Sequence, residues 1–166
     1  MRSAMIYALR YADREQEFIQ PEQNAFQEMQ IPCLNSAFQN ISKEPLEVFT
    51  SDTEGGLVFP EFYYDDFVPL FQEHIYQAML EHSVHNLFTR KIIVTDRIQN
   101  LSVPYLMGLP PRIPVCAPDG LPDESRAGSY QMFRSEHLSD SRIYIRNSLR
   151  ELFETLHPSG MELDII

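Results

Sequence analysis

The stretch that decides the fold is RIYIRNSLRELFETLHPSGMELDI, residues 142–165. Its opening, residues 142–145, is rich in β-branched and aromatic side chains, which predicts a strand. Ser148 followed three residues later by Glu151 has the spacing of a capping box, which predicts a helix start. The apolar residues that follow recur at the i, i+3, i+4, i+7 spacing of a helix with one buried face. They are Leu149, Leu152, Phe153 and Leu156.

The same stretch also predicts how the helix ends. Pro158 and Gly160 are typical of the residues that stop a helix. Met161 to Ile165 then alternates between apolar and acidic side chains, which predicts a half-buried strand. The stretch therefore predicts a strand–helix–strand unit.

An earlier part of the chain, residues 57–98, predicts a second unit of the same plan. It consists of a strand at Leu57–Phe59, a helix and a strand at Leu87–Arg97. The residues that recur at helical spacing on one side of the helix are Phe67, Leu70, Phe71, Ile75, Ala78, Met79 and His82. Asp65 or Asp66 is expected to cap this helix, with Pro69 in its first turn. Identity between the two units is slight, so a repeat and a coincidence of pattern both remain open.

Other parts of the chain predict further strands and loops. The predicted strands are Met5–Leu9, Ile31–Leu34, Leu46–Thr50 and Tyr130–Phe133. Six prolines between Val103 and Pro122 exclude a helix there and predict extended or turning backbone. Pro122–Gly128 predicts an exposed loop. We therefore expect one α+β domain over residues 1–166, with a mixed, mainly antiparallel sheet and two or three helices packed on it.

The composition excludes several classes of protein. The 166 residues include 24 acidic and 13 basic side chains, for a net charge of −11. This charge argues against direct binding to nucleic acid, whose phosphates need basic partners. No apolar run approaches the ~20 residues of a membrane span, and the first residues do not resemble a signal peptide. Two cysteines, Cys33 and Cys116, form no disulfide framework and are expected to be reduced thiols of a cytoplasmic protein.

No set of residues in the sequence predicts a catalytic, cofactor-binding or metal site. His74, His82 and His85 lie close together in the sequence, but their spacing matches no common metal-binding motif. Neither cysteine belongs to a Cys-x-x-Cys pair, so both are interpreted as buried structural residues.

The acidic charge is concentrated near the N-terminus. Residues 1–66 contain 12 acidic and 4 basic side chains. Two interpretations are open: a solvated surface that maintains solubility, or a docking face for a basic partner. The candidate contact residues are Asp52, Glu54, Glu61, Tyr63, Tyr64, Asp65 and Asp66. Tyrosine is a favoured interface anchor, although the two tyrosines equally fit a strand with one ring inward and one outward.

The C-terminal stretch resembles the ending of a family of bacterial immunity proteins, in which a strand leads into a Leu-rich helix, a glycine and a short apolar strand. The resemblance is firmest over residues 142–166. It implies a cytosolic, non-enzymatic protein that binds a cognate toxin and neutralises it by covering its active site or substrate groove. A basic toxin, such as a nuclease, would suit the acidic face. A secretion chaperone for an effector protein and a small enzyme of unrecognised type are the alternatives.

Overall fold

The computed structural model of the chain describes residues 5–12, 19–20, 44–50, 59–65 and 68–166. Its strands are β1 (Ile6–Tyr11), β2 (Ile19–Gln20), β3 (Leu46–Thr50), β4 (Phe62–Tyr64), β5 (Pro69–Gln72), β6 (Phe88–Asp96), β7 (Leu101–Leu109), β8 (Arg112–Ile113), β9 (Met132–Ser135), β10 (Tyr144–Arg146) and β11 (Met161–Ile165). Its helices are α2 (Glu73–Glu81), α3 (Asn147–Leu156) and the 3-10 turn η2 (Glu124–Arg126). The α+β class predicted from the sequence is confirmed.

The described strands form two sheets, where the sequence predicts one. The first has the order β11-β1-β10-β9-β8, and the second has the order β2-β3-β6-β7-β5-β4. All pairings are antiparallel except β3 with β6 and β8 with β9. One hydrophobic cluster includes side chains from both sheets, such as Leu9 of β1 and Ile92 of β6. The two sheets therefore share a core.

The two strand–helix–strand units have the same pairing pattern. The strands β10 and β11, on either side of α3, both pair antiparallel with β1. The strands β5 and β6, on either side of α2, both pair antiparallel with β7. In each unit the two strands joined by the helix are therefore parallel and are separated by one antiparallel strand. The first strand of this second arrangement is β5, whereas the sequence predicts Leu57–Phe59, which lies mostly outside the described residues, so the predicted repeat over residues 57–98 stays a prediction.

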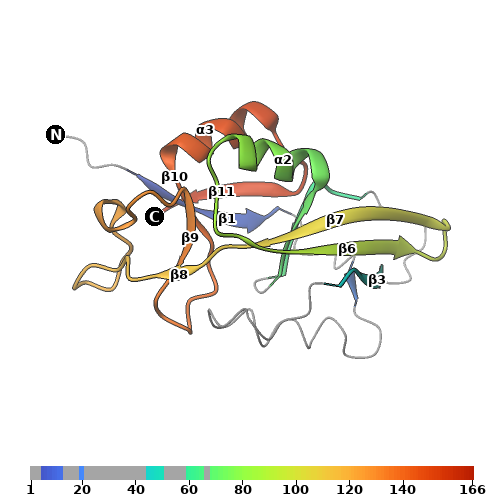
Figure 1. Cartoon of the computed structure of the whole chain (residues 1–166), viewed down its shortest axis with the longest axis horizontal. Coiled ribbons are helices and arrows are strands. Elements are labelled where there is room, and N and C mark those ends of the chain that lie inside the picture. The colour runs from blue at the N-terminus through green and yellow to red at the C-terminus, as the bar shows by residue number, and fades with distance from the viewer. Residues whose placement is uncertain (1–4, 13–18, 21–43, 51–58, 66–67) are drawn as a thin grey trace.

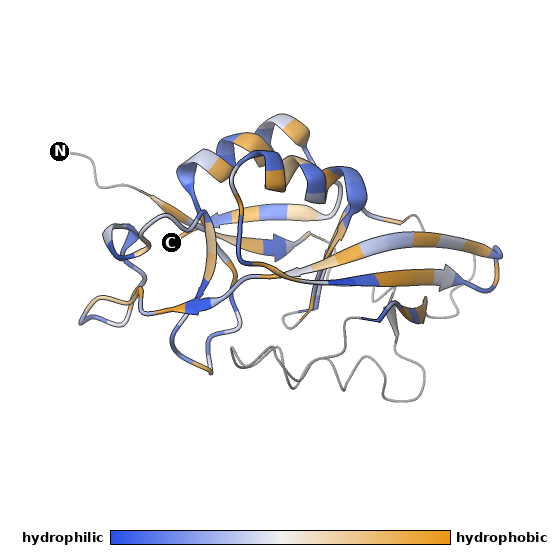
Figure 2. Cartoon of the chain, viewed as in Figure 1, coloured by the Kyte–Doolittle hydropathy of each residue, from blue (hydrophilic) through white to orange (hydrophobic). Residues whose placement is uncertain are grey.

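Both long helices lie on the same side of the strands (Figure 1). Helix α2 buries Ile75, Tyr76 and Met79, and helix α3 buries Leu149 and Phe153. Hydrophobic and hydrophilic residues alternate along both ribbons, as expected for helices with one face in the core (Figure 2).

The first helix begins later than the sequence predicts. Leu70 and Phe71 belong to β5, where they pair with β7, and the helix starts at Glu73. Both side chains are fully buried, so their apolar character reflects a strand covered on both faces. Asp65 does not cap the helix, because its Oδ1 accepts a hydrogen bond of 2.7 Å from the backbone N–H of Val68. Asp66 lies outside the described residues.

The predicted capping box of the second helix is wrong. Arg146 holds the N-cap position, and no side chain caps the helix. The Ser148 hydroxyl instead makes a short hydrogen bond with the Gln131 side chain. Glu151 accepts a hydrogen bond of 3.3 Å from the Asn147 side chain. The predicted end of the helix and the final strand are confirmed.

Most of the other predicted elements agree with the structure. Strands β1, β3 and β6 lie where the sequence predicts them, and β9 begins two residues later than expected. The proline-rich segment is extended in β7 and β8 and contains no α-helix, as predicted. The prediction of an exposed loop at Pro122–Gly128 is wrong in part, because this segment contains η2 and the buried Ala127. The predicted strands at Leu57–Phe59 and Ile31–Leu34 fall wholly or mostly outside the described residues.

A turn at Ser159 and Gly160 joins the two sheets. The backbone N–H of Phe62 donates to the Ser159 carbonyl at 3.0 Å, and the N–H of Ala12 donates to the Gly160 carbonyl at 2.8 Å. Gly160 has a φ of +85°, a conformation that L side chains rarely adopt. The turn therefore requires glycine for its backbone and brings β1 and β4 together.

Candidate functional site

The structure describes four of the seven predicted contact residues: Glu61, Tyr63, Tyr64 and Asp65. Asp52, Glu54 and Asp66 lie outside the described residues. Tyr63 and Tyr64 are only 4% and 6% exposed, so neither ring offers the open surface that a docking anchor needs.

Both faces of β4, which carries Tyr63 and Tyr64, are covered, so the alternative of one inward and one outward ring is also wrong. The Tyr63 ring packs edge-on against the Tyr11 ring, with 5.1 Å between the ring centroids. The Tyr64 hydroxyl donates to the Ser141 carbonyl.

Glu61, one of the described acidic candidates, has partners on two elements. Its carboxylate pairs with the His74 ring and accepts a hydrogen bond of 3.1 Å from the backbone N–H of Ser159. Partial burial raises the pKa of Glu61, but the hydrogen bonds from Ser159 and His74 outweigh it and hold the pKa below its ordinary value. Glu61 therefore links the start of α2 to the turn after α3.

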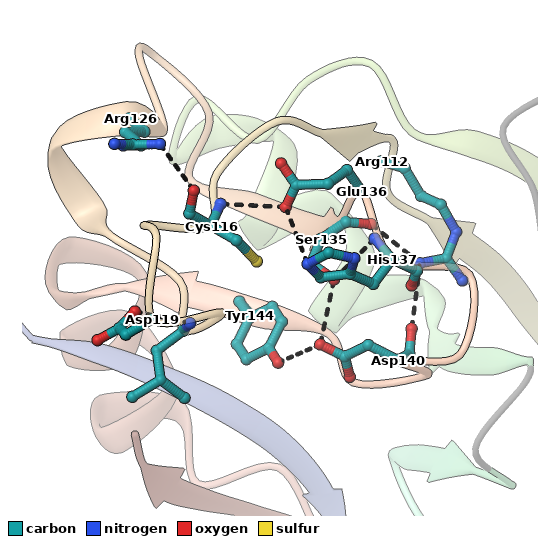
Figure 3. Close-up of polar contacts among 10 residues, drawn as sticks. Arg112, Cys116, Asp119, Arg126, Ser135, Glu136, His137, Asp140 and Tyr144 are labelled. Atoms are coloured by element: carbon teal, nitrogen blue, oxygen red, sulfur yellow. Dashed lines mark hydrogen bonds and ion pairs between the residues drawn. The ribbon is translucent and has the colours of Figure 1, made fainter.

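A second polar cluster lies at the ends of β8 and β9. These strands are parallel, so the segments that leave their carboxyl ends emerge at the same edge of the sheet. Cys116 follows β8, and Glu136 and His137 follow β9. Their donor atoms (the sulfur, a carboxylate oxygen and a ring nitrogen) all lie within 4.8 Å of one another. Figure 3 shows dashed lines from the Glu136 carboxylate to the backbone nitrogen of Cys116 and to the His137 ring.

The backbone around this cluster is fixed by two arginines (Figure 3). One guanidinium nitrogen of Arg112 donates to the carbonyls of Ser135, His137 and Asp140 at 3.0, 2.8 and 3.1 Å. Arg126 donates to the Cys116 carbonyl at 2.7 Å. Both segments that supply the cluster are thus held by charge-assisted hydrogen bonds.

Asp140, in the loop between β9 and β10, accepts hydrogen bonds from three side chains. Its carboxylate accepts hydrogen bonds from the hydroxyls of Tyr144 and Ser135 and from Arg142. Partial burial raises the pKa of Asp140, but these hydrogen bonds outweigh it and lower the pKa below its ordinary value. Burial and the same carboxylate also raise the pKa of Tyr144, so this hydroxyl remains a donor at neutral pH.

The surroundings of Cys116 favour the protonated thiol at neutral pH. Burial, together with the hydrogen bond and negative charge of Glu136, raises the pKa of Cys116 to about 11. The hydrogen bond from Cys116 in turn lowers the pKa of Glu136. A nucleophilic cysteine needs a lowered pKa, so the arrangement does not favour thiolate catalysis.

The sequence did not predict this cluster. Cys116 was interpreted as a buried structural residue, whereas it is partly exposed and lies beside Glu136. Twenty positions separate the two, and their proximity depends on the pairing of two short parallel strands, which no local spacing reveals.

The histidines singled out in the sequence have other partners. His74 pairs with Glu61, and the His85 ring stacks on the Tyr130 ring with 5.3 Å between the ring centroids. Within the part of the chain that the structure describes, the single group of metal-ligand side chains is the one formed by Cys116, Glu136 and His137.

Neither a protein-family model nor a curated protein matches this chain. Among the described elements, no helix has the length and apolar character required to cross a bilayer.

Proposed function

We propose that the protein is an immunity protein that binds a basic bacterial toxin and covers its active site or substrate groove. The resemblance of residues 142–166 to immunity proteins motivates the class, and the charge of the chain motivates the partner. A domain of this size has enough surface for a standard interface of ~1,600 Å² in total.

The observation that carries the proposal is the acidic character of the two helices. Helix α2 contains two glutamates and no lysine or arginine, and helix α3 contains two glutamates and one arginine. All four glutamates are exposed, and both helices lie on one side of the strands (Figure 1). The four are Glu73, Glu81, Glu151 and Glu154.

Several of the described arginines form ion pairs within the protein. Arg10 pairs with Asp164 and Glu162 of β11, and Arg146 pairs with Glu124. On the helical side, Arg150 pairs with Glu154 at 2.6 Å and lies 3.8 Å from Glu151, so one positive charge is shared by two carboxylates. The remaining helix carboxylates give this side a negative potential that accelerates the approach of a cationic partner and rejects an anionic one.

The class of function is tested by co-expressing the protein with the toxin encoded beside it and measuring survival. Protection, together with a stable complex of the two purified proteins, is the expected result. Unaltered killing would reject the immunity function. A homodimer that retains the unfolded N-terminus of an effector would instead identify a secretion chaperone.

The contact face is tested by removing one charge from each helix in the double variant Glu81→Gln/Glu151→Gln. We expect a several-fold slower association with the toxin and a weaker dependence on salt, because rim charges act mainly on the association rate. The matched control, Glu47→Gln/Asp119→Asn, removes the same charge from exposed positions outside the helices. Equal effects of the two variants would place the interface elsewhere.

A further inference from the structure

The cluster at the ends of β8 and β9 has the donor chemistry of a metal site. It combines the sulfur of Cys116, a carboxylate oxygen of Glu136 and a ring nitrogen of His137. Sulfur and imidazole donors favour borderline metals such as zinc, whereas magnesium and calcium favour sites built from oxygen alone. One thiolate and one carboxylate also supply two negative charges, which match a divalent cation.

The spacing of these atoms is close to that of a tetrahedral zinc site. Bonds of about 2.0–2.3 Å place neighbouring ligand atoms of such a site about 3.5 Å apart. In the structure the ligand atoms lie within 4.8 Å of one another, and the His137 Nε2 lies 4.0 Å from a Glu136 oxygen. Closing the site requires a movement of about 1 Å or less for each group. The side chains of Glu136 and His137 are 35% and 55% exposed, so they have room to make it.

The surrounding contacts hold the ligand-bearing backbone while leaving these side chains adjustable. Arg112 binds the carbonyl of His137 at 2.8 Å, and Arg126 binds the carbonyl of Cys116 at 2.7 Å. The backbone N–H of Cys116 donates to the Glu136 carboxylate at 3.1 Å, which holds that group beside Cys116. Such outer contacts orient metal ligands and typically change metal affinity by about 10–100-fold.

Among the described residues, the cluster supplies three ligand side chains and no fourth. Asp140, the nearest further carboxylate of the loop, is already engaged by Tyr144, Ser135 and Arg142. Three protein ligands with one open position are typical of zinc sites that hold a water molecule or accept a donor from another molecule.

We propose that Cys116, Glu136 and His137 bind one Zn²⁺ ion, with the fourth position filled by water. On binding, the Cys116 thiol loses its proton to solvent and the thiolate sulfur bonds to the metal. The ion joins the segment after β8 to the segment after β9 and adds a cross-link to the loop that Arg112 holds. This inference is independent of the proposed immunity function.

The first test uses Co²⁺ as a spectroscopic probe of the chelator-treated full-length protein. A bound thiolate gives a near-ultraviolet sulfur-to-cobalt charge-transfer band, and a tetrahedral site gives intense visible bands. We expect both, with saturation at one Co²⁺ per chain. Cys116→Ser should lose the charge-transfer band, whereas Cys33→Ser should retain it. Absence of the band from the unaltered protein, or its loss in Cys33→Ser alone, would overturn the proposal.

The second test measures Zn²⁺ affinity by competition with a chromophoric chelator. His137→Gln and Glu136→Gln are expected to weaken binding at least tenfold, as is typical when the ligation of a metal is disturbed. Both positions are exposed, so these variants should fold, and circular dichroism checks that they do. His82→Gln, an exposed histidine of another segment, is the matched control. Equal affinity of the control and the two ligand variants would refute the site.

Discussion

Replacing Gly160 by alanine is expected to disrupt the turn that joins the two sheets. Gly160 has a φ of +85°, and an L residue in left-handed backbone costs roughly 1–2 kcal/mol. A Cβ added there would lie 2.3 Å from the Phe62 carbonyl oxygen and 3.0 Å from both Pro60 and Tyr11. Carbon and oxygen normally approach to about 3.3 Å, so the backbone would have to move by about 1 Å.

That movement would break the hydrogen bond of 3.0 Å from Phe62 to the Ser159 carbonyl. Leaving these groups unpaired adds about 1–3 kcal/mol. We therefore expect Gly160→Ala to lower the free energy of unfolding by about 2–5 kcal/mol, and the melting temperature by on the order of 10 °C.

The assay is urea unfolding followed by circular dichroism, with Gly120→Ala as the matched control. Gly120 has nearly the same φ, +84°, but no atom lies within 4 Å of its added Cβ. The control should therefore lose only the backbone term of roughly 1–2 kcal/mol. Equal losses in the two variants would show that the contact with Phe62 contributes nothing and would refute the reasoning.

Three further predictions concern the polar cluster and the helix core. The folded state lowers the pKa of Asp140 below its ordinary value of 3.8, so its charge stabilises the protein fully above pH 3.8, and this stability is lost as the pH falls through the folded pKa. Asp140→Asn should therefore lower the free energy of unfolding at neutral pH. It should also weaken the fall of this free energy as the pH drops below 3.8. The same fall in the variant and in the unaltered protein would contradict the prediction. Burial and Glu136 raise the pKa of Cys116 to about 11, so iodoacetamide should alkylate this thiol slowly in the presence of a chelator. Glu136→Gln should accelerate the alkylation, which is measured by peptide mass spectrometry. An equal or slower rate in this variant would count against the contact between Cys116 and Glu136. Phe153→Ala should lower the free energy of unfolding by about 3–5 kcal/mol, because the ring is 2% exposed. Leu156→Ala, at a position 38% exposed, should lower it by less than about 1 kcal/mol in the same urea assay. Similar losses in the two variants would show that the buried face of α3 is wrongly assigned.

The fold was predictable where hydrophobic pattern and local structure agree. The strand–helix–strand unit at the C-terminus forms within one or two residues of its predicted bounds. The start of α2 was not predictable, because Leu70 and Phe71 fit a helix stripe and are also suited to a strand buried on both faces. A run of apolar residues does not by itself distinguish the two structures.

The polar cluster depends on pairings that join distant parts of the chain. The proximity of Cys116 and Glu136 follows from the short parallel pair β8 and β9, whose register has no local signal. The burial of Tyr63 and Tyr64 likewise follows from neighbours such as Tyr11 and Ser141, far away in the sequence. The acidic pattern indicated charge but did not indicate which carboxylates would be exposed.

The position of β1 between β10 and β11 has a consequence for synthesis. Tyr7 pairs with Ile145 on one side and with Ile165 on the other, so this strand has both of its partners near the opposite end of the sequence. At typical translation rates a ribosome needs on the order of ten seconds to make the intervening chain. During that interval the apolar nascent strand lacks its native neighbours, which makes it a natural target for chaperones that bind emerging polypeptides.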